Sequence, residues 1–125
     1  MNMKARPVIL VIDDSKELLE VVQLICEKQG YDAITNTSSI DIAAFVTEHK
    51  IDLLIIDVIL NGENGRDICK ELKSNAGTNY FPIILMSASS EHLSDHGDCD
   101  ADDIIEKPFD IKTLFGKVGK WVVGS

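Results

Sequence analysis

Four short apolar runs in this sequence each end on a polar residue that can bind a cation or a phosphoryl group. The first run is followed by Asp13 and Asp14, and the second ends at Asp57. The third ends at Ser87 and the fourth at Lys107. If the runs are parallel strands of one open sheet, their carboxyl ends lie at one edge, where ligands bind in such folds. The sequence therefore predicts a site with three carboxylates, one hydroxyl and one ammonium group.

The carboxylates of this set could bind a metal ion and carry out nucleophilic chemistry. Asp13 and Asp14 are adjacent and can reach one point together, and Mg²⁺ takes oxygen ligands of this kind. The simpler interpretation is a solvated pair that caps a helix at Ser15. Asp57 closes an apolar run and begins a turn-rich loop, so it is a candidate nucleophile that takes up a phosphoryl group as an acyl phosphate. Its simpler interpretation is a helix or loop cap.

The charges favour one joint site over separate caps. Lys107 follows an apolar run and can pair with Asp57 or with phosphate, although it could also be an ordinary surface lysine. Ser87 can donate its hydroxyl to a phosphoryl oxygen, or it can simply cap a strand. Three close carboxylates would repel by about 4 kcal/mol per pair at an effective dielectric of 20. A divalent cation and one lysine balance them, so we expect both.

An alternation of strand and helix is expected to position these residues. The apolar runs are rich in β-branched residues and lack polar alternation, which is typical of strands covered on both faces. Helices are expected to begin at Ser15, at Ser38 or Ser39, near Arg66 and at Asp110. We predict an α/β fold with a doubly wound parallel sheet in one domain, 1–125. The predicted strands are 8–12, 31–36, 52–57, 83–87 and 103–107.

Two regions near the C-terminus carry more specific expectations. The last helix is predicted to turn five apolar residues inward: Ile111, Leu114, Phe115, Val118 and Val122. The stretch 89–100 is mostly polar, and Leu93 is its only large apolar residue. We expect any helix there to be short and mobile. His92 and His96 are spaced to share a metal, but exposed positions on a weak helix suit them better.

Composition excludes several classes of protein. The formal net charge is −9, so the chain is not expected to bind nucleic acid directly, because such binding depends largely on Lys and Arg at phosphates. No apolar run is long enough for a membrane span and no signal peptide is evident, so we expect a cytoplasmic protein. The three cysteines lack a CxxC pair, which disfavours zinc and a disulfide framework. Cys26 and Cys69 are predicted to be buried core residues.

Four sequence pieces together resemble the receiver domain of two-component response regulators. They are VILVIDDS, LLIIDVILNGENG, PIILMSA and DADDIIEKPF. The resemblance covers essentially the whole chain and implies a flavodoxin-like (βα)5 fold with strand order 2-1-3-4-5. The chain departs from the family pattern at Asn61, Asp100 and Ile104, the last of which replaces a usual aromatic switch residue. Switching is therefore expected to rely more on reordering of 89–100.

The resemblance also implies a role for each site residue. Asp13 and Asp14 would hold Mg²⁺ together with Asp57, and the backbone carbonyl of Ile59 would complete the metal shell. Asp57 would be the phosphoacceptor. Ser87 and Lys107 would then bind the phosphoryl group. The peptide bond after Lys107 would be cis.

The resemblance implies a signalling domain. We do not expect it to be an enzyme that acts on a separate substrate. It would be phosphorylated by a histidine kinase or a phosphotransfer protein and would act on an unknown downstream protein. The alternative is an aspartate-nucleophile phosphatase of the haloacid dehalogenase type. That chemistry uses a second Asp two residues after the nucleophile, and Ile59 stands there instead. A nucleotide or flavin binder is disfavoured because no glycine-rich loop follows the first strand.

Overall fold

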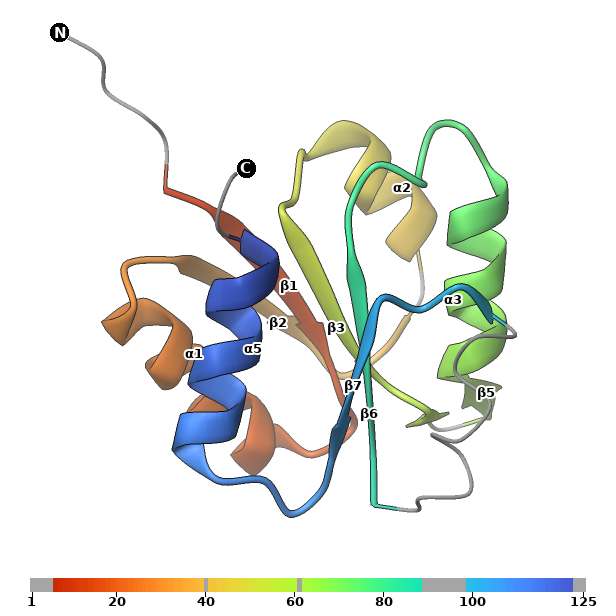
Figure 1. Ribbon diagram of the computed structural model, residues 1–125. Helices are drawn as coiled ribbons and strands as arrows, with labels where there is room; N and C mark the ends of the chain where they lie inside the picture. Colours follow the sequence, from red (N-terminus) through yellow and green to blue (C-terminus); the bar gives the residue numbers. More distant parts are fainter. Residues whose placement is uncertain (1–5, 40, 61, 89–98, 123–125) are drawn as a thin grey trace, which may run out of the picture.

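A five-stranded parallel sheet forms the centre of the computed structural model, which describes residues 6–39, 41–60, 62–88 and 99–122. The strands lie in the order β2-β1-β3-β6-β7 (Figure 1), and each neighbouring pair is parallel. β6 and β7 are the fourth and fifth strands of this sheet along the chain, because β4 and β5 form a separate small sheet. The doubly wound sheet and the predicted strand order 2-1-3-4-5 are therefore confirmed. The strands are β1 (Val8–Ile12), β2 (Asp32–Asn36), β3 (Leu53–Asp57), β6 (Ile83–Ser87) and β7 (Asp103–Glu106).

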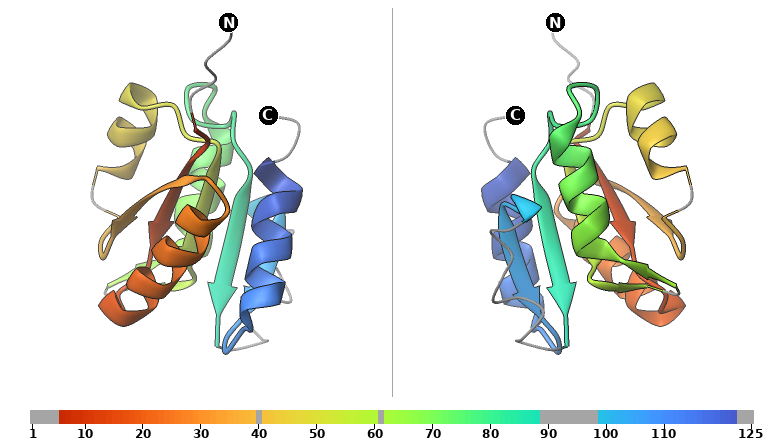
Figure 2. Two further views of the ribbon diagram at one scale, coloured as in Figure 1. Left: turned by 90° about the vertical axis from the view of Figure 1, so that its left-hand side faces the viewer. Right: turned by 90° about the vertical axis from the view of Figure 1, so that its right-hand side faces the viewer.

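Helices cover both faces of the sheet (Figure 2). One face packs against α1 and α5, and the other packs against α2 and α3. This two-sided cover is the reason why the central strands carry apolar residues without alternation. The helices are α1 (Lys16–Lys28), α2 (Ile42–Glu48), α3 (Gly65–Ser74) and α5 (Ile111–Val122).

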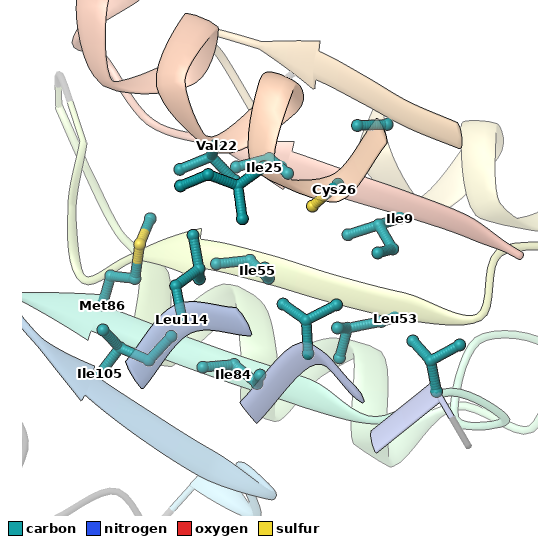
Figure 3. Close-up of a cluster of buried hydrophobic side chains, with 14 of the residues drawn as sticks. Ile9, Val22, Ile25, Cys26, Leu53, Ile55, Ile84, Met86, Ile105 and Leu114 are labelled. Atoms are coloured by element: carbon teal, nitrogen blue, oxygen red, sulfur yellow. The ribbon is translucent and has the colours of Figure 1, made fainter. Parts of the chain in front are cut away.

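The core is divided by the sheet into two apolar clusters. Every residue of β3 and β6 is buried, and alternate side chains point to opposite faces. Ile55 and Ile84 meet Leu114 of α5 on one face (Figure 3). Leu54 and Ile56 lie in the cluster on the other face. Burial of each such side chain contributes about 1.5–3 kcal/mol, which fixes the register of the strands that carry the site.

Three helix starts have the caps that the sequence favours. Ser15 caps α1 by accepting a hydrogen bond from the Leu18 amide, as predicted. Asn64 caps α3 through the Arg66 amide. Asp110 accepts from the amide of residue 113 at 2.7 Å, which confirms the expected start of α5. These caps satisfy amides that have no partner within the helix.

The start of α2 differs from the prediction that Ser38 or Ser39 would open it. The helix begins at Ile42 and follows Asp41, which has φ 61° and makes no side-chain cap. The Ser39 hydroxyl instead donates a hydrogen bond to the carboxylate of Glu63. The Ser39 side chain therefore bonds to a residue distant in sequence, whereas the local pattern predicted that it would cap the helix.

A small antiparallel hairpin after β3 was expected only as a loop. It pairs β4 (Ile59–Leu60) with β5 (Glu63–Asn64). The intervening sequence is Asn-Gly, the strongest short signal for a two-residue hairpin turn, and Gly62 has φ 75°. Two residues per strand are too few to show an alternating pattern, so the hairpin was missed.

The prediction for α5 is partly wrong. Leu114, Val118 and Val122 are buried as expected, but Ile111 and Phe115 are 63% and 43% exposed. Successive helical residues are about 100° apart, so Phe115 lies well to the side of the Leu114 stripe. The buried face of α5 is therefore narrower than its apolar content suggests.

Cys26 and Cys69 are buried, as predicted. Three strands are shorter than predicted by one residue at one end, which is a normal difference at strand ends. The expectations for residues 89–98, including Leu93, His92 and His96, lie outside the described residues. Within the described part of the chain, no helix combines the length and apolarity needed to cross a membrane.

Candidate functional site

The three predicted aspartates meet at one edge of the sheet. Asp13 and Asp14 follow β1, and Asp57 is the last residue of β3. Because β1 and β3 are neighbours in parallel register, their carboxyl ends coincide. One carboxylate oxygen from each of the three aspartates lies within 4.8 Å of the others. The sheet thus places three possible oxygen ligands around one point.

Lys107 connects two of these carboxylates. Its Nζ donates hydrogen bonds of 2.7 Å to Asp57 Oδ2 and of 2.7 Å to Asp13 Oδ2. The contact with Asp57 was expected, and the contact with Asp13 was not. Lys107 follows β7, and its amide donates to the Ser87 carbonyl at 2.8 Å, which continues the β6–β7 ladder. The Lys107–Pro108 peptide bond is cis, as the resemblance implied.

Local hydrogen bonds hold the second oxygen of each bridged carboxylate. Asp13 Oδ1 accepts from the Ser15 amide at 2.9 Å. Asp57 Oδ1 accepts from the Ile59 amide at 3.0 Å. Each carboxylate therefore uses one oxygen for its own turn and the other for Lys107. This arrangement fixes the orientation of both groups before any ligand binds.

Burial makes the charge balance of the site important. The Asp13 side chain is fully buried and the Asp57 side chain is 8% exposed, whereas Asp14 is exposed. A buried carboxylate needs a compensating partner, and Lys107 supplies one for both. Three carboxylates against one ammonium group still leave two negative charges in excess. The site is therefore suited to a cation.

The protonation equilibria reflect the same environment. Burial raises the pKa of Asp57 above its usual value, and this outweighs the opposing hydrogen bonds from Lys107 and the Ile59 amide. Burial alone would lower the pKa of Lys107, but its hydrogen bonds to Asp13 and Asp57 raise that pKa overall. Lys107 therefore stays charged at neutral pH. The Asp57 carboxylate, in turn, is more basic than a solvated one.

The two remaining predicted residues lie beside Asp57. Ser87 ends β6, is 1% exposed, and follows Met86, which is the register partner of Asp57. Its position is therefore one residue further along the same edge of the sheet. Ile59 is two residues beyond Asp57, and its side chain is 54% exposed. The five other residues predicted for the site thus gather around the Asp57 carboxylate.

Gly65 is a residue of this site that sequence reasoning missed. Its amide donates to the Val58 carbonyl at 2.7 Å, which holds the start of α3 against the end of β3. A Cβ atom at Gly65 would lie 2.1 Å from the Asp57 carbonyl oxygen, so only glycine fits. The available signal was a glycine at the first position of a helix, where its flexibility serves no local purpose.

An open cavity of about 470 Å³ adjoins the acidic site. It lies between the start of α1 and the loop that joins β7 to α5, and Lys107 forms part of its wall. The apolar residues that line it form a surface next to the carboxylates, which another protein could contact. The lining residues are Ser15, Leu18, Val21, Ala88, Lys107, Pro108 and Phe109.

Comparison with known proteins identifies the same family. The response regulator receiver domain family matches residues 9–119. The curated protein "Heme response regulator HssR" of Staphylococcus saprophyticus is 29% identical over 112 residues, which are 87% of this chain and 48% of that protein. The chain therefore spans about half the length of this relative.

Solved structures share the fold. A putative response regulator from Chloroflexus aurantiacus has a TM-score of 0.87 at 23% identity, over 94% of this chain and 98% of that one. The receiver domain of a histidine kinase from Syntrophus aciditrophicus has a TM-score of 0.84 at 27% identity, over 94% and 91%. Nothing in these comparisons supports a haloacid dehalogenase phosphatase, which Ile59 also disfavours. The chain belongs to the response regulator receiver domain family, whose members signal in two-component systems.

Proposed function

We propose that Asp57 accepts a phosphoryl group from a phosphohistidine on a histidine kinase or a histidine phosphotransfer protein. The observation that supports this most strongly is the Lys107 ammonium, hydrogen-bonded at 2.7 Å to both Asp57 and Asp13 inside a carboxylate cluster. An ordinary surface lysine would not be expected to contact buried carboxylates at the ends of two neighbouring strands, β1 and β3. The family assignment supports the same partners.

The reaction is a simple displacement. An Asp57 carboxylate oxygen attacks phosphorus, the P–N bond to the histidine breaks, and its electron pair returns to the imidazole nitrogen. The product is an acyl phosphate on Asp57. Its phosphoryl oxygens carry about two negative charges, which Lys107 neutralises in part. The Ser87 hydroxyl, one residue along the same edge, donates to a phosphoryl oxygen.

The donor set fits Mg²⁺ as a cofactor. Hard cations prefer carboxylate and carbonyl oxygens, and three carboxylates converge here with two negative charges in excess. Asp13, Asp14, Asp57 and the Ile59 carbonyl would hold the ion. When bound, Mg²⁺ supplies positive charge to the oxygens of the transferring phosphoryl group. The protein's own part is to orient Asp57 through Ile59 and Lys107.

The adjoining cavity suggests how the phosphodonor reaches Asp57. It opens beside Lys107 and is lined by apolar residues of α1 and of the β7–α5 loop. A partner helix seated there would bring its phosphohistidine to the carboxylate edge. The signal would then pass to a downstream protein through a conformational change, as expected for a domain without a substrate of its own.

Intact-mass spectrometry with a small acyl-phosphate donor tests the proposal. The wild-type protein with Mg²⁺ should gain about 80 Da, the mass of one phosphoryl group. The gain should disappear with a chelator and in Asp57→Asn. Asp32→Asn is the matched control, because Asp32 is an exposed strand aspartate in an ion pair with Arg6. Labelling of Asp57→Asn equal to that of wild type would contradict the proposal.

A further inference from the structure

Two cysteines distant in sequence meet beneath α3, away from the carboxylate site. Cys69 is fully buried in α3, and Cys99 is 2% exposed in the chain that leads into β7. The Cys69 thiol donates to the Cys99 carbonyl oxygen at 3.3 Å, across 30 residues of sequence. Figure 1 shows the chain before β7 beside α3. Both residues belong to the apolar cluster on the α2 and α3 face.

The two thiols also influence each other directly. Burial raises the pKa of Cys69, and the charge and hydrogen bonding of the Cys99 thiol raise it further. The 3.3 Å contact between the Cys69 thiol and the Cys99 backbone shows that the two residues touch. Cys69 is consequently a weak nucleophile, because the thiolate is the reactive form.

Cys99 is the member of the pair that can meet a small reagent. It lines a surface cavity of about 240 Å³ together with Arg66 and Lys70 of α3. The other lining residues are Asn64 and Asp67, so the wall beside Cys99 is polar, which suits a small polar reagent. Cys69 is not among the residues that line this cavity. The two cysteines therefore have unequal roles, with Cys99 facing the cavity and Cys69 behind it.

Cys26 provides an internal comparison. It is fully buried in α1, within the cluster on the other face of the sheet. Burial raises its pKa to about 12, and the charge of Glu27 adds to this. The sheet separates it from the other two cysteines. Thiol chemistry at Cys26 is therefore expected to be slow, and no intramolecular partner is within its reach.

We propose that Cys69 and Cys99 form a reversible disulfide when the protein is exposed to hydrogen peroxide. The Cys99 thiolate attacks one peroxide oxygen, the O–O bond breaks, and hydroxide leaves, which gives a sulfenic acid. The Cys69 thiol then displaces the sulfenic hydroxyl as water, and the S–S bond forms. The two thiols lose two electrons and two protons, and the peroxide becomes two waters. A dithiol reductant reverses the change.

The disulfide would tie α3 to the chain that enters β7. α3 begins at Gly65, which packs against the Asp57 backbone, and β7 leads to Lys107. The bond would therefore join two elements next to the proposed phosphorylation site. It would close a loop of 30 residues. Closing a loop of this length restricts the unfolded chain, so the oxidised form should melt about 10 °C higher than the reduced form.

Peptide mapping after peroxide treatment of the native protein tests the proposal. The expected product is a monomer lighter by about 2 Da, in which one cross-linked peptide contains Cys69 and Cys99. Cys26 should still be alkylated after denaturation. Reduction with dithiothreitol should restore the original mass and melting temperature.

Matched variants make the result decisive. Cys26→Ala should form the disulfide at the wild-type rate, because its cysteine lies on the other face. Cys69→Ala should accumulate Cys99 sulfenic acid, which can be trapped with dimedone, and should not lose 2 Da. Disulfide-linked dimers, or three thiols still alkylated in the treated wild type, would overturn the proposal. This outcome is independent of whether Asp57 is phosphorylated.

Discussion

Asp14 is the exposed member of the three carboxylates, and in the described part of the chain Lys107 forms its ion pairs with Asp13 and Asp57 instead. Its neighbours Asp13 and Asp57 share that lysine, so Asp14 adds negative charge without a cation of its own in the cluster. A residue in this position does little for folding in the absence of metal. In the function proposed above, Asp14 serves only the cation site, whereas Asp13 also pairs with Lys107.

Replacement of Asp14 should separate stability from metal binding. In the presence of a chelator, Asp14→Ala should melt about 2–5 °C higher than wild type, because repulsion within the carboxylate cluster is relieved. Mg²⁺ should raise the melting temperature of wild type, since a ligand of the folded state stabilises it. That increase should be lost in the variant. A lower melting temperature in chelator with an intact Mg²⁺ response would instead show a structural aspartate.

The substitution Gly65→Ala tests how tightly the backbone around Asp57 is packed. Gly65→Ala places a methyl group where the Asp57 carbonyl oxygen stands, so the start of α3 must move away from β3. We expect a loss of about 2–4 kcal/mol in the free energy of unfolding. Phosphorylation of Asp57 by a small donor should also slow. Both can be measured by denaturant titration and timed mass spectrometry.

Gly116→Ala is the matched control for that substitution. Gly116 lies within α5, and a Cβ atom there would have open space around it. The same chemical change should therefore stabilise the protein by up to about 1 kcal/mol through helix propensity. If both substitutions had the same effect, the close packing at Gly65 would have no energetic consequence.

At the scale of elements, α5 is fastened to the edge strand β7 by one carboxylate. Asp103 accepts hydrogen bonds of 2.8 Å from Lys117 Nζ and 2.8 Å from Trp121 Nε1. Burial alone would raise the pKa of Asp103, but hydrogen bonds from Lys117, Trp121 and the Ile104 amide lower it overall. The charged form therefore stabilises the contact between this helix and the strand that leads to Lys107.

This contact predicts a pH-dependent loss of stability. Because the pKa of Asp103 is lowered in the folded state, its contribution is present above the unfolded value of 3.8 and is lost as the pH falls through the folded value. Asp103→Asn should be less stable than wild type by about 1 kcal/mol at pH 7. Denaturant titrations near pH 3 should show a smaller difference. A difference that grew in acid would contradict the assignment.

The success of sequence-based prediction also varied by element. β3 and β6 were predictable because both faces are covered, which leaves continuous apolar runs. The start of α2 was not, because Glu63 is brought by the fold to the Ser39 hydroxyl. The exposed Phe115 misled the prediction for α5, because apolar content does not reveal how wide the buried face is. Local patterns predict elements well only where no distant residue competes.

At the scale of the whole molecule, the site depends on strand order. Asp13 and Lys107 are 94 residues apart in sequence, and they meet because β1, β3, β6 and β7 are parallel neighbours in that order. The sequence predicted which residues would gather, since each follows an apolar run. It could not predict that Lys107 would bridge two aspartates, or that α3 would need Gly65. Both depend on how separate elements pack.

In the proposed reaction, Asp57 carries the phosphoryl group as an acyl phosphate. The most direct measurement is borohydride reduction of the phosphorylated protein, followed by sequencing of its peptides by mass spectrometry. Borohydride reduces an acyl phosphate to an alcohol but leaves a serine phosphate intact, so the linkage and the residue are identified together. We expect homoserine at position 57, about 14 Da lighter than aspartate, with Asp13, Asp14 and Ser87 unchanged. An unreduced Asp57 with phosphate retained on Ser87, or homoserine at position 13 or 14, would contradict it.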